Sequence, residues 1–201
     1  IDNFQEGKIE WLPALNKPNS NKQEQREIPF SREIWIEQDD FMEEPSKKFF
    51  RLAPGKEVRL RYAFFVTCNA VIKDEDGEIV ELRCSYDPET RGGNAPDGRK
   101  VKGTIHWVSA EHAKDAEVRI YNSFYNTPSP GRERDFIEDI NPNSLEVLEN
   151  CKIEPDLIAL DDNVPIQFER LGYFYKDSDT TPEKHIYNRT ISLRDTWNKK
   201  L

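Results

Sequence analysis

The sequence is poor in the residues that cross-link a small fold or anchor a chain in a membrane. It has one methionine and three cysteines among its 201 residues. Cys68, Cys84 and Cys151 are widely spaced and form no CxxC pair, which favours reduced thiols in a cytoplasmic protein and argues against a zinc site. No apolar run is long enough to cross a bilayer and no signal peptide is recognisable, so we expect no membrane partner.

The motifs of common enzyme classes are missing as well. The sequence contains no GxGxxG, no GxxxxGKS/T, no HExxH and no GxSxG. Its adjacent carboxylates, such as Asp39-Asp40 and Asp161-Asp162, are typical of solvated turns, because acid–base partners need different environments to separate their pKa values. We therefore expect no catalytic residue, no metal and no cofactor in this chain, and we favour binding over catalysis.

Basic charge is concentrated in one stretch of an otherwise acidic chain. The formal net charge is −9, which argues against non-specific binding to a polyanion. A specific RNA reader needs only a local basic patch, and Lys47–Arg61 (KKFFRLAPGKEVRLR) holds six basic residues against the single carboxylate of Glu57. We call this stretch the basic window.

The second half of the basic window alternates apolar and polar residues. This period predicts a half-buried strand that begins at Val58 and continues through Tyr62 to Val66. On such a strand Arg59 and Arg61 stand on the wet face, about 7 Å apart. Two guanidinium forks at that spacing suit the bases of a splayed single strand of RNA. A merely solvated basic face is the alternative interpretation of the same pattern.

The remaining pattern predicts a mostly-β chain of short strands and frequent turns, without any long helical period. Two short echoes suggest a repeat: EVRL at Glu57–Leu60 returns as EVRI at Glu117–Ile120, and Thr104-Ile105 returns as Thr190-Ile191. Two similar small β-barrels in tandem would leave such echoes.

We accordingly expect three parts. Residues 1–28 form an N-terminal segment that joins the second barrel, residues 29–109 form the first barrel, and residues 110–201 form the second. Because the chain opens at Ile1 without an initiator methionine, we interpret it as a piece of a longer protein.

Several runs, in order and over nearly the whole chain, carry a family resemblance. They are FSREIWIEQDDF, KEVRLR, DGRKVKGTIHWVSA, NPNSL, QFERLGYF and NRTISLRDTW. Together they resemble the C-terminal anticodon-binding region of glutaminyl-tRNA synthetase, a class I aminoacyl-tRNA synthetase and glutamine–tRNA ligase. The resemblance implies a distal and a proximal β-barrel that hold the anticodon loop of glutamine tRNA. It also implies an upstream catalytic domain, absent here, that uses ATP.

The resemblance also assigns roles to basic residues of the window. Arg51 matches the arginine that reads the third anticodon base, a guanine, and Arg59 and Arg61 match the arginines at the first base, C or U. Possible contacts to the RNA backbone are the lysines of the same window: Lys47, Lys48 and Lys56.

In the second barrel, Gln167 and Arg170 match the residues that read the central uracil. They lie in a predicted strand over residues 164–175. Because residues i and i+3 point to opposite faces of a plain strand, we expect a bulge near Gly172.

Other identities stay open. A glutamyl-tRNA synthetase of the archaeal or eukaryotic kind shares the central U of the anticodon, a ribosomal protein that binds 5S rRNA has similar barrels, and a protein-interaction β module would fit if the basic strand were buried. We expect a monomer whose partners are glutamine tRNA and the protein's own catalytic domain.

Overall fold

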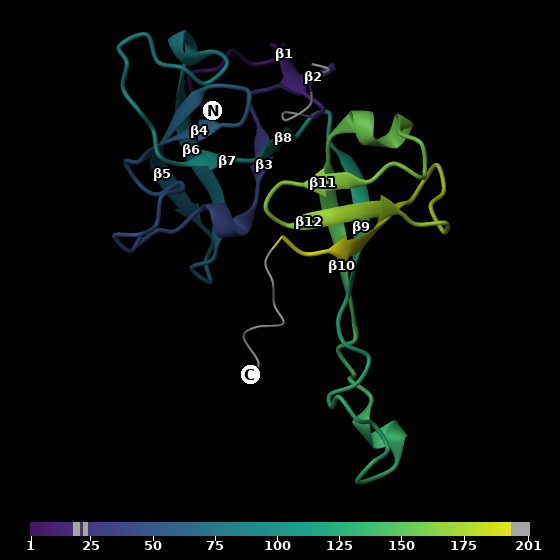
Figure 1. Cartoon of the computed structure of the whole chain (residues 1–201). Helices are drawn as coiled ribbons and strands as arrows, with labels where there is room; N and C mark the ends of the chain where they lie inside the picture. Colours follow the sequence, from purple (N-terminus) through teal and green to yellow (C-terminus); the bar gives the residue numbers. More distant parts are fainter. Residues whose placement is uncertain (18–20, 22–23, 194–201) are drawn as a thin grey trace. The chain divides into compact units, whose positions relative to one another are not determined.

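The computed structural model describes residues 1–17, 21 and 24–193 (Figure 1). The prediction of a mostly-β chain is confirmed, and the described residues contain no α-helix. The strands form four sheets, and in the described part of the chain none of these closes into a barrel. In place of the predicted closed barrels, the described strands form open sheets. No helix among these residues is long and apolar enough to cross a membrane.

The chain divides into two compact units, of which the first is Ile1–Ala113 and the second begins at Lys114. The first unit has three sheets, with the strand orders β1-β2, β3-β8 and β6-β5-β4-β7. Its strands are β1 (Glu10–Leu15), β2 (Gln25–Phe30), β3 (Ile34–Ile36), β4 (Glu57–Leu60), β5 (Phe65–Lys73), β6 (Ile79–Asp87), β7 (Thr104–Ile105) and β8 (Trp107–Ser109). Two short 3-10 helices, η1 (Gln38–Asp40) and η2 (Pro88–Thr90), lie in its connections.

The core of the first unit is built around the ring of Phe30, at the end of β2. This ring is fully buried, and its centroid lies 4.9 Å from that of Phe4, 5.2 Å from that of Phe64 and 5.1 Å from that of Trp107. Edge-on and tilted aromatic contacts of this kind stabilise a core beyond the area they bury. The aromatic cluster therefore joins the N-terminal segment to β2, β8 and the β4–β5 connection.

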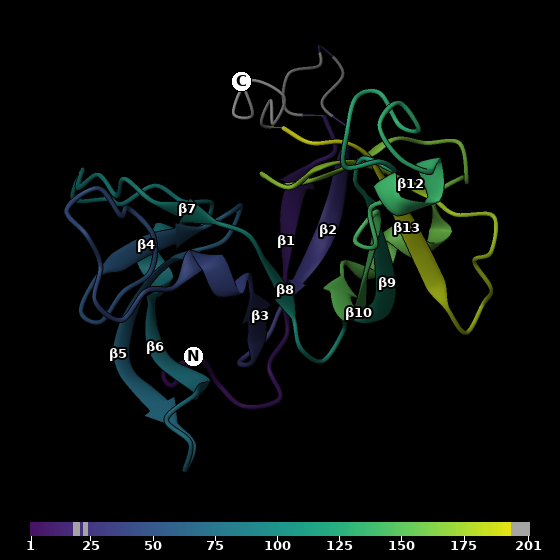
Figure 2. The same cartoon turned by 90° about the horizontal axis from the view of Figure 1, so that it is seen from below.

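Residues 1–28 pack in this first unit, whereas the sequence led us to expect them with the second. Phe4, Leu12, Ala14 and Ile28 are buried in the core around Phe30. β1 and β2 pair as an antiparallel hairpin, seen side by side in Figure 2. Leu12 and Ala14 alternate with exposed neighbours, so one face of β1 closes the core of the first unit. The segment looked polar because its core residues are few and widely spaced.

The strand predicted from Val58 to Val66 is interrupted. β4 ends at Leu60, and a tight turn follows in which the Leu60 N–H donates to the Phe64 carbonyl over 2.8 Å. Tyr62 has a φ of 63° in this turn, a conformation that is uncommon for a bulky residue. Since the apolar residues keep alternating through the turn, the sequence period does not reveal it.

The second unit is one five-stranded sheet with the order β10-β9-β13-β12-β11. Its core residues include Val118, Phe174 and the fully buried Tyr187. β9 and β10 continue into a long arm at the bottom of Figure 1. The elements are β9 (Lys114–Tyr121), η3 (Phe136–Asp139), β10 (Leu145–Ile153), η4 (Pro155–Ala159), β11 (Ile166–Phe168), β12 (Gly172–Lys176) and β13 (His185–Ile191).

The sequence echoes have a counterpart in the topology. In the first unit β4 pairs in parallel with β7, and Arg59 lies opposite Thr104. In the second unit β9 pairs in parallel with β13, and Arg119 lies opposite Asn188. The EVR segment thus forms one strand of the parallel pair in each unit, and the strand that carries Thr-Ile forms the other.

We expect Phe30→Ala to lower the free energy of unfolding by about 3–5 kcal/mol, because it removes the ring around which the first core is packed. Denaturant unfolding followed by tryptophan fluorescence measures this, since Trp107 contacts the ring. The matched control is Phe136→Ala on the arm, whose ring is 55% exposed and whose loss should change stability by less than about 0.5 kcal/mol. Equal losses for the two variants would contradict the assigned core.

Candidate nucleic-acid interface

The basic window folds into two segments that meet at Gly103, just before β7. A Cβ atom placed on Gly103 would lie 1.9 Å from the carbonyl oxygen of Phe50 and 3.3 Å from Cγ1 of Val58. Only glycine permits so close a backbone approach. Phe50 and Val58, which precede Arg51 and Arg59, therefore both pack against Gly103. The two arginines accordingly lie on adjacent segments.

Arg51 is fixed by acceptors of the η1 segment. Its Nη1 donates to the backbone carbonyl of Asp39 over 2.9 Å and lies 3.1 Å from Oδ1 of Asp40, a fully buried carboxylate. Since a planar guanidinium carries five N–H donors, such anchoring at one nitrogen orients the fork and leaves other donors for a ligand. The Arg51 side chain is therefore partly exposed and held in one orientation by these acceptors.

Arg59 lies half-buried over an aromatic ring, and not on an open wet face as the sequence pattern suggested. Its guanidinium carbon is 5.4 Å from the centroid of Phe65, the residue opposite it on β5. Gly93 packs against its stem, so that a Cβ atom at position 93 would lie 2.8 Å from Cδ of Arg59. Within the described residues Nε of Arg59 is buried without a hydrogen-bond partner. Such a donor is costly to leave unpaired, and a ligand acceptor would satisfy it.

Arg61 follows the end of β4 and lies in the turn. Its backbone remains paired, since its N–H donates to Ile105 and its carbonyl accepts from the Trp107 indole. Its guanidinium carbon is 5.0 Å from the ring centroid of Tyr62. The prediction that Arg59 and Arg61 share one flat strand face is therefore wrong, because β4 ends at Leu60. Each arginine instead lies over its own aromatic ring.

Arg99 is a structural residue that sequence reasoning missed. It donates two hydrogen bonds to the Glu57 carboxylate, at 3.0 and 3.1 Å, and also pairs with Asp87 and Asp97. Its guanidinium carbon is 5.4 Å from the centroid of Phe65, as that of Arg59 is. Arg99 therefore closes the 88–103 loop over β4. Its position far along the chain from Glu57 gave no sequence signal for this contact.

The carboxylates around Arg99 show its electrostatic effect. The side-chain hydrogen bond from Arg99 holds the pKa of Asp87 below its ordinary value, with a further bond from the Glu89 N–H. The backbone N–H and then the side chain of Arg99 lower the pKa of Asp97 in the same way. In turn, the hydrogen bonds that Arg99 donates to Glu57, Asp87 and Asp97 raise the pKa of its guanidinium.

The three predicted backbone-binding lysines are exposed: Lys47, Lys48 and Lys56. A further basic residue joins the window, because Nζ of Lys102 lies 4.9 Å from the ring centroid of Phe50, itself half-exposed. Sequence reasoning missed Lys102, although a charge count over the KVKG run before β7 would have pointed to it.

The predicted residues of the second unit lie at one hairpin. Gln167 is exposed on β11, and Arg170 is half-buried in the tight turn that leads to β12. Residues 164–175 therefore form two strands and not one. The bulge expected near Gly172 is present as a register shift after Tyr173, opposite β13. The turn, in which Arg170 has a φ of 63°, is what brings positions 167 and 170 to one end of the hairpin.

Comparison with known proteins identifies the family. Residues 1–87 and residues 104–177 match two family models, each described as an anticodon-binding domain of class I tRNA synthetases (E and Q). The chain belongs to this family.

Curated relatives of this anticodon-binding chain carry the name glutamine–tRNA ligase. The protein of Bradyrhizobium diazoefficiens is 57% identical over 201 residues, which are 100% of this chain and 36% of that protein. The protein of Nitrobacter winogradskyi is 54% identical over 199 residues (99% and 35%), and that of Aliivibrio fischeri is 50% identical over 198 residues (98% and 36%). The chain thus spans about a third of the length of these relatives.

The family assignment confirms the resemblance drawn from the sequence motifs. It favours a tRNA synthetase domain over a ribosomal protein or a protein-interaction module. The residue-by-residue roles of the anticodon readers stay predictions. The motif SLRDTW is described only as far as Leu193, and its Arg194–Trp197 part lies outside the described residues.

We expect Arg99→Gln to destabilise the first unit at neutral pH and to have a smaller effect in acid. The folded-state pKa values of Asp87 and Asp97 are lowered, so their stabilisation is present above the ordinary carboxyl value of ~3.9 and is lost as the pH falls through the lower folded values. Denaturant unfolding of parent and variant at pH 7 and pH 3 measures the difference. A gap between the two proteins that does not shrink at pH 3 would contradict the assigned pairing.

Proposed function

We propose that this chain binds the anticodon loop of glutamine tRNA and presents that tRNA to the catalytic domain of a longer glutamine–tRNA ligase. The observation that carries the proposal is the pair of anticodon-binding family matches, together with relatives named glutamine–tRNA ligase at up to 57% identity. ATP use and aminoacylation belong, in this proposal, to the part of the protein outside the chain. We place the protein in the cytoplasm and propose that it acts as a monomer.

The arrangement of the arginines supports this function. Specific reading of single-stranded RNA depends on unstacked bases whose edges meet planar donors such as guanidinium groups. Arg59 is oriented by Phe65 and Arg61 by Tyr62, so little side-chain entropy remains to be lost when a base binds. The buried Nε of Arg59 offers a donor that an acceptor of the RNA would satisfy.

We assign the three anticodon positions to separate groups of residues. Arg59 and Arg61 read the first base, and Arg51 reads the third. Gln167 and Arg170, at the β11–β12 hairpin, read the central uracil. The exposed lysines of the basic window contact phosphates: Lys47, Lys48 and Lys56.

Titration of the chain with anticodon stem-loops of glutamine and glutamate tRNA tests the proposal. We expect tighter binding of the glutamine stem-loop. We also expect the logarithm of the binding constant to fall linearly with the logarithm of the salt concentration, with a slope that steepens by ~0.7 for each phosphate contact. Equal affinity for both RNAs would indicate that the chain recognises only the central U, which the two anticodons share. No binding of either RNA would sink the proposed function.

Arg59→Lys is the sharpest single substitution, because lysine keeps the charge and loses the planar fork. We expect it, like Arg59→Ala, to cost about 1–3 kcal/mol of binding free energy and to relax the choice at one anticodon position. The matched controls, Lys47→Ala and Lys56→Ala, should weaken all RNAs alike and lower the salt slope by ~0.7 each. If Arg59→Lys binds and discriminates like the parent, charge alone matters and the base-reading role is wrong.

A further inference from the structure

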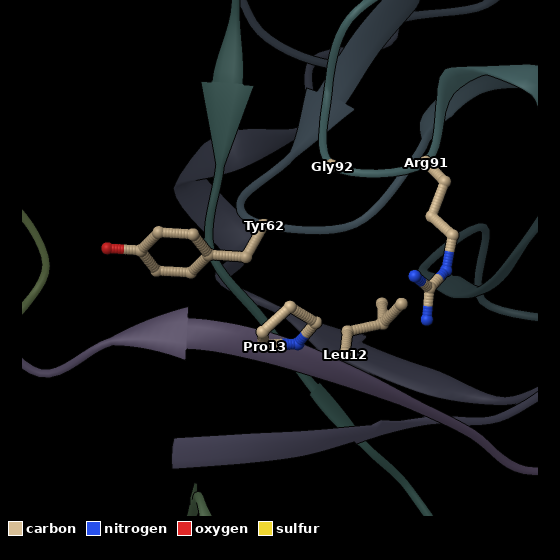
Figure 3. A pocket seen from close by; sticks show the side chains of 5 residues that line it. All are labelled: Leu12, Pro13, Tyr62, Arg91 and Gly92. Carbon is tan, nitrogen blue, oxygen red and sulfur yellow. The ribbon is translucent and has the colours of Figure 1, made fainter. Parts of the chain in front are cut away.

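A small open pocket lies between β1, the turn after β4 and the loop that follows η2. Its volume is about 230 Å³, and it is lined by Leu12, Pro13, Tyr62, Arg91 and Gly92. Figure 3 shows Tyr62 and Arg91 on opposite sides of it, with Leu12 and Pro13 along one wall and Gly92 across from them. The Tyr62 hydroxyl points away from Arg91, so carbon atoms of the tyrosine and of β1 face the space between them. Of these lining residues, the anticodon assignment uses only Tyr62, whose ring orients Arg61.

Tyr62 occupies its place at an energetic cost. Its φ of 63° lies in the left-handed region, where glycine or asparagine fits without strain and a bulky ring does not. The phenol is only weakly tied, since its hydroxyl lies 3.4 Å from the carbonyl oxygen of Leu15 and 3.4 Å from Nη2 of Arg61. Residues held in such sparsely populated backbone conformations cluster at functional sites. The ring that this strained backbone presents is one wall of the pocket.

Arg91, on the opposite side, is already fixed in place. Its Nε donates to Oε1 of Glu10 over 2.8 Å, and its Nη2 donates to the Trp11 carbonyl over 3.1 Å. These two bonds leave the Nη1 amino group of Arg91 as a donor for a ligand. A guanidinium held in this way can bind or stack on a planar ligand without first losing conformational entropy.

The surroundings identify the kind of ligand. Gly92 lines the pocket, and its neighbour Gly93 packs against the stem of Arg59. On the other side, the guanidinium of Arg61 lies over the Tyr62 ring. The pocket therefore adjoins residues that contact Arg59 and Arg61, the two arginines assigned to the first base. A flat, partly apolar ligand attached to a negatively charged backbone fits an apolar slot that has Arg91 in its wall and Arg59 and Arg61 nearby, and an unstacked nucleobase is such a ligand.

We propose that this pocket binds one unstacked base of the RNA loop, with its ring against Tyr62 and its edge toward Arg91. The inference rests on the proposed RNA-binding function and deepens it, because it adds Tyr62 and Arg91 to the arginines as specificity-determining residues. The base stacks on the Tyr62 ring and packs against Leu12 and Pro13, and Nη1 of Arg91 donates to an acceptor on its edge.

Thermodynamic coupling between protein and RNA changes tests this proposal. The parent chain, Tyr62→Leu, Tyr62→Phe and the arm control Phe136→Leu are titrated with the intact glutamine anticodon stem-loop. The same proteins are titrated with a set of stem-loops that each carry one abasic nucleotide in the loop. We expect Tyr62→Leu to weaken binding of the intact loop about tenfold, whereas Tyr62→Phe and Phe136→Leu stay close to the parent.

One abasic position should identify the base in the pocket. At that position the parent loses about tenfold in affinity, and Tyr62→Leu loses almost nothing further, because the two changes remove the same contact. Tyr62→Asn, whose side chain tolerates the left-handed backbone, provides a second ring-free variant if Tyr62→Leu folds poorly.

The outcomes separate the two proposals. If the parent fails to bind the intact stem-loop, the proposed function itself is wrong. If the parent binds but every abasic position weakens the parent and Tyr62→Leu alike, the tyrosine is only structural and the pocket holds no base. Equal losses for Tyr62→Phe and Tyr62→Leu would also overturn the proposal, since the phenylalanine ring keeps the stacking surface.

Discussion

The electrostatics of the basic window depend on two guanidinium groups, those of Arg59 and Arg99, that lie over the buried ring of Phe65. Arg59 and Arg99 each lie 5.4 Å from the centroid of Phe65, whose side chain is fully buried. Two like charges so close to one ring would repel each other strongly if neither were compensated. Arg99 is compensated, because it binds Glu57, Asp87 and Asp97.

The pairing of carboxylates with Arg99 also explains how an acidic chain presents a site for a polyanion. The carboxylates nearest the β4 strand are bound to Arg99, which lowers the repulsion they would exert on approaching phosphates. Arg59, by contrast, has no carboxylate partner among the described residues and keeps a buried donor unsatisfied. The net charge of −9 is therefore a poor guide to the local field at the window.

The sequence predicted the class of fold, because strand period and turn residues are local signals, whereas the roles of the candidate site residues stay predictions. It missed the turn after Leu60, because the apolar residues keep alternating through Tyr62 and Phe64 while the backbone reverses. It also misassigned residues 1–28, since a few buried side chains such as Phe4 outweigh a polar composition. The contact between Arg99 and Glu57 joins distant parts of the chain, and no local pattern encodes such a pairing.

The parallel strand pairs have a consequence for how the chain folds during synthesis. Each pair joins one strand to another that follows much later in the same unit: β4 to β7 in the first unit, and β9 to β13 in the second. Such non-local pairing carries a loop-closure cost that is repaid only when the late strand arrives, and it slows folding. Neither sheet is complete until nearly all of its unit has left the ribosome, so the exposed edges of β4 and β9 are each open to mispairing during that interval.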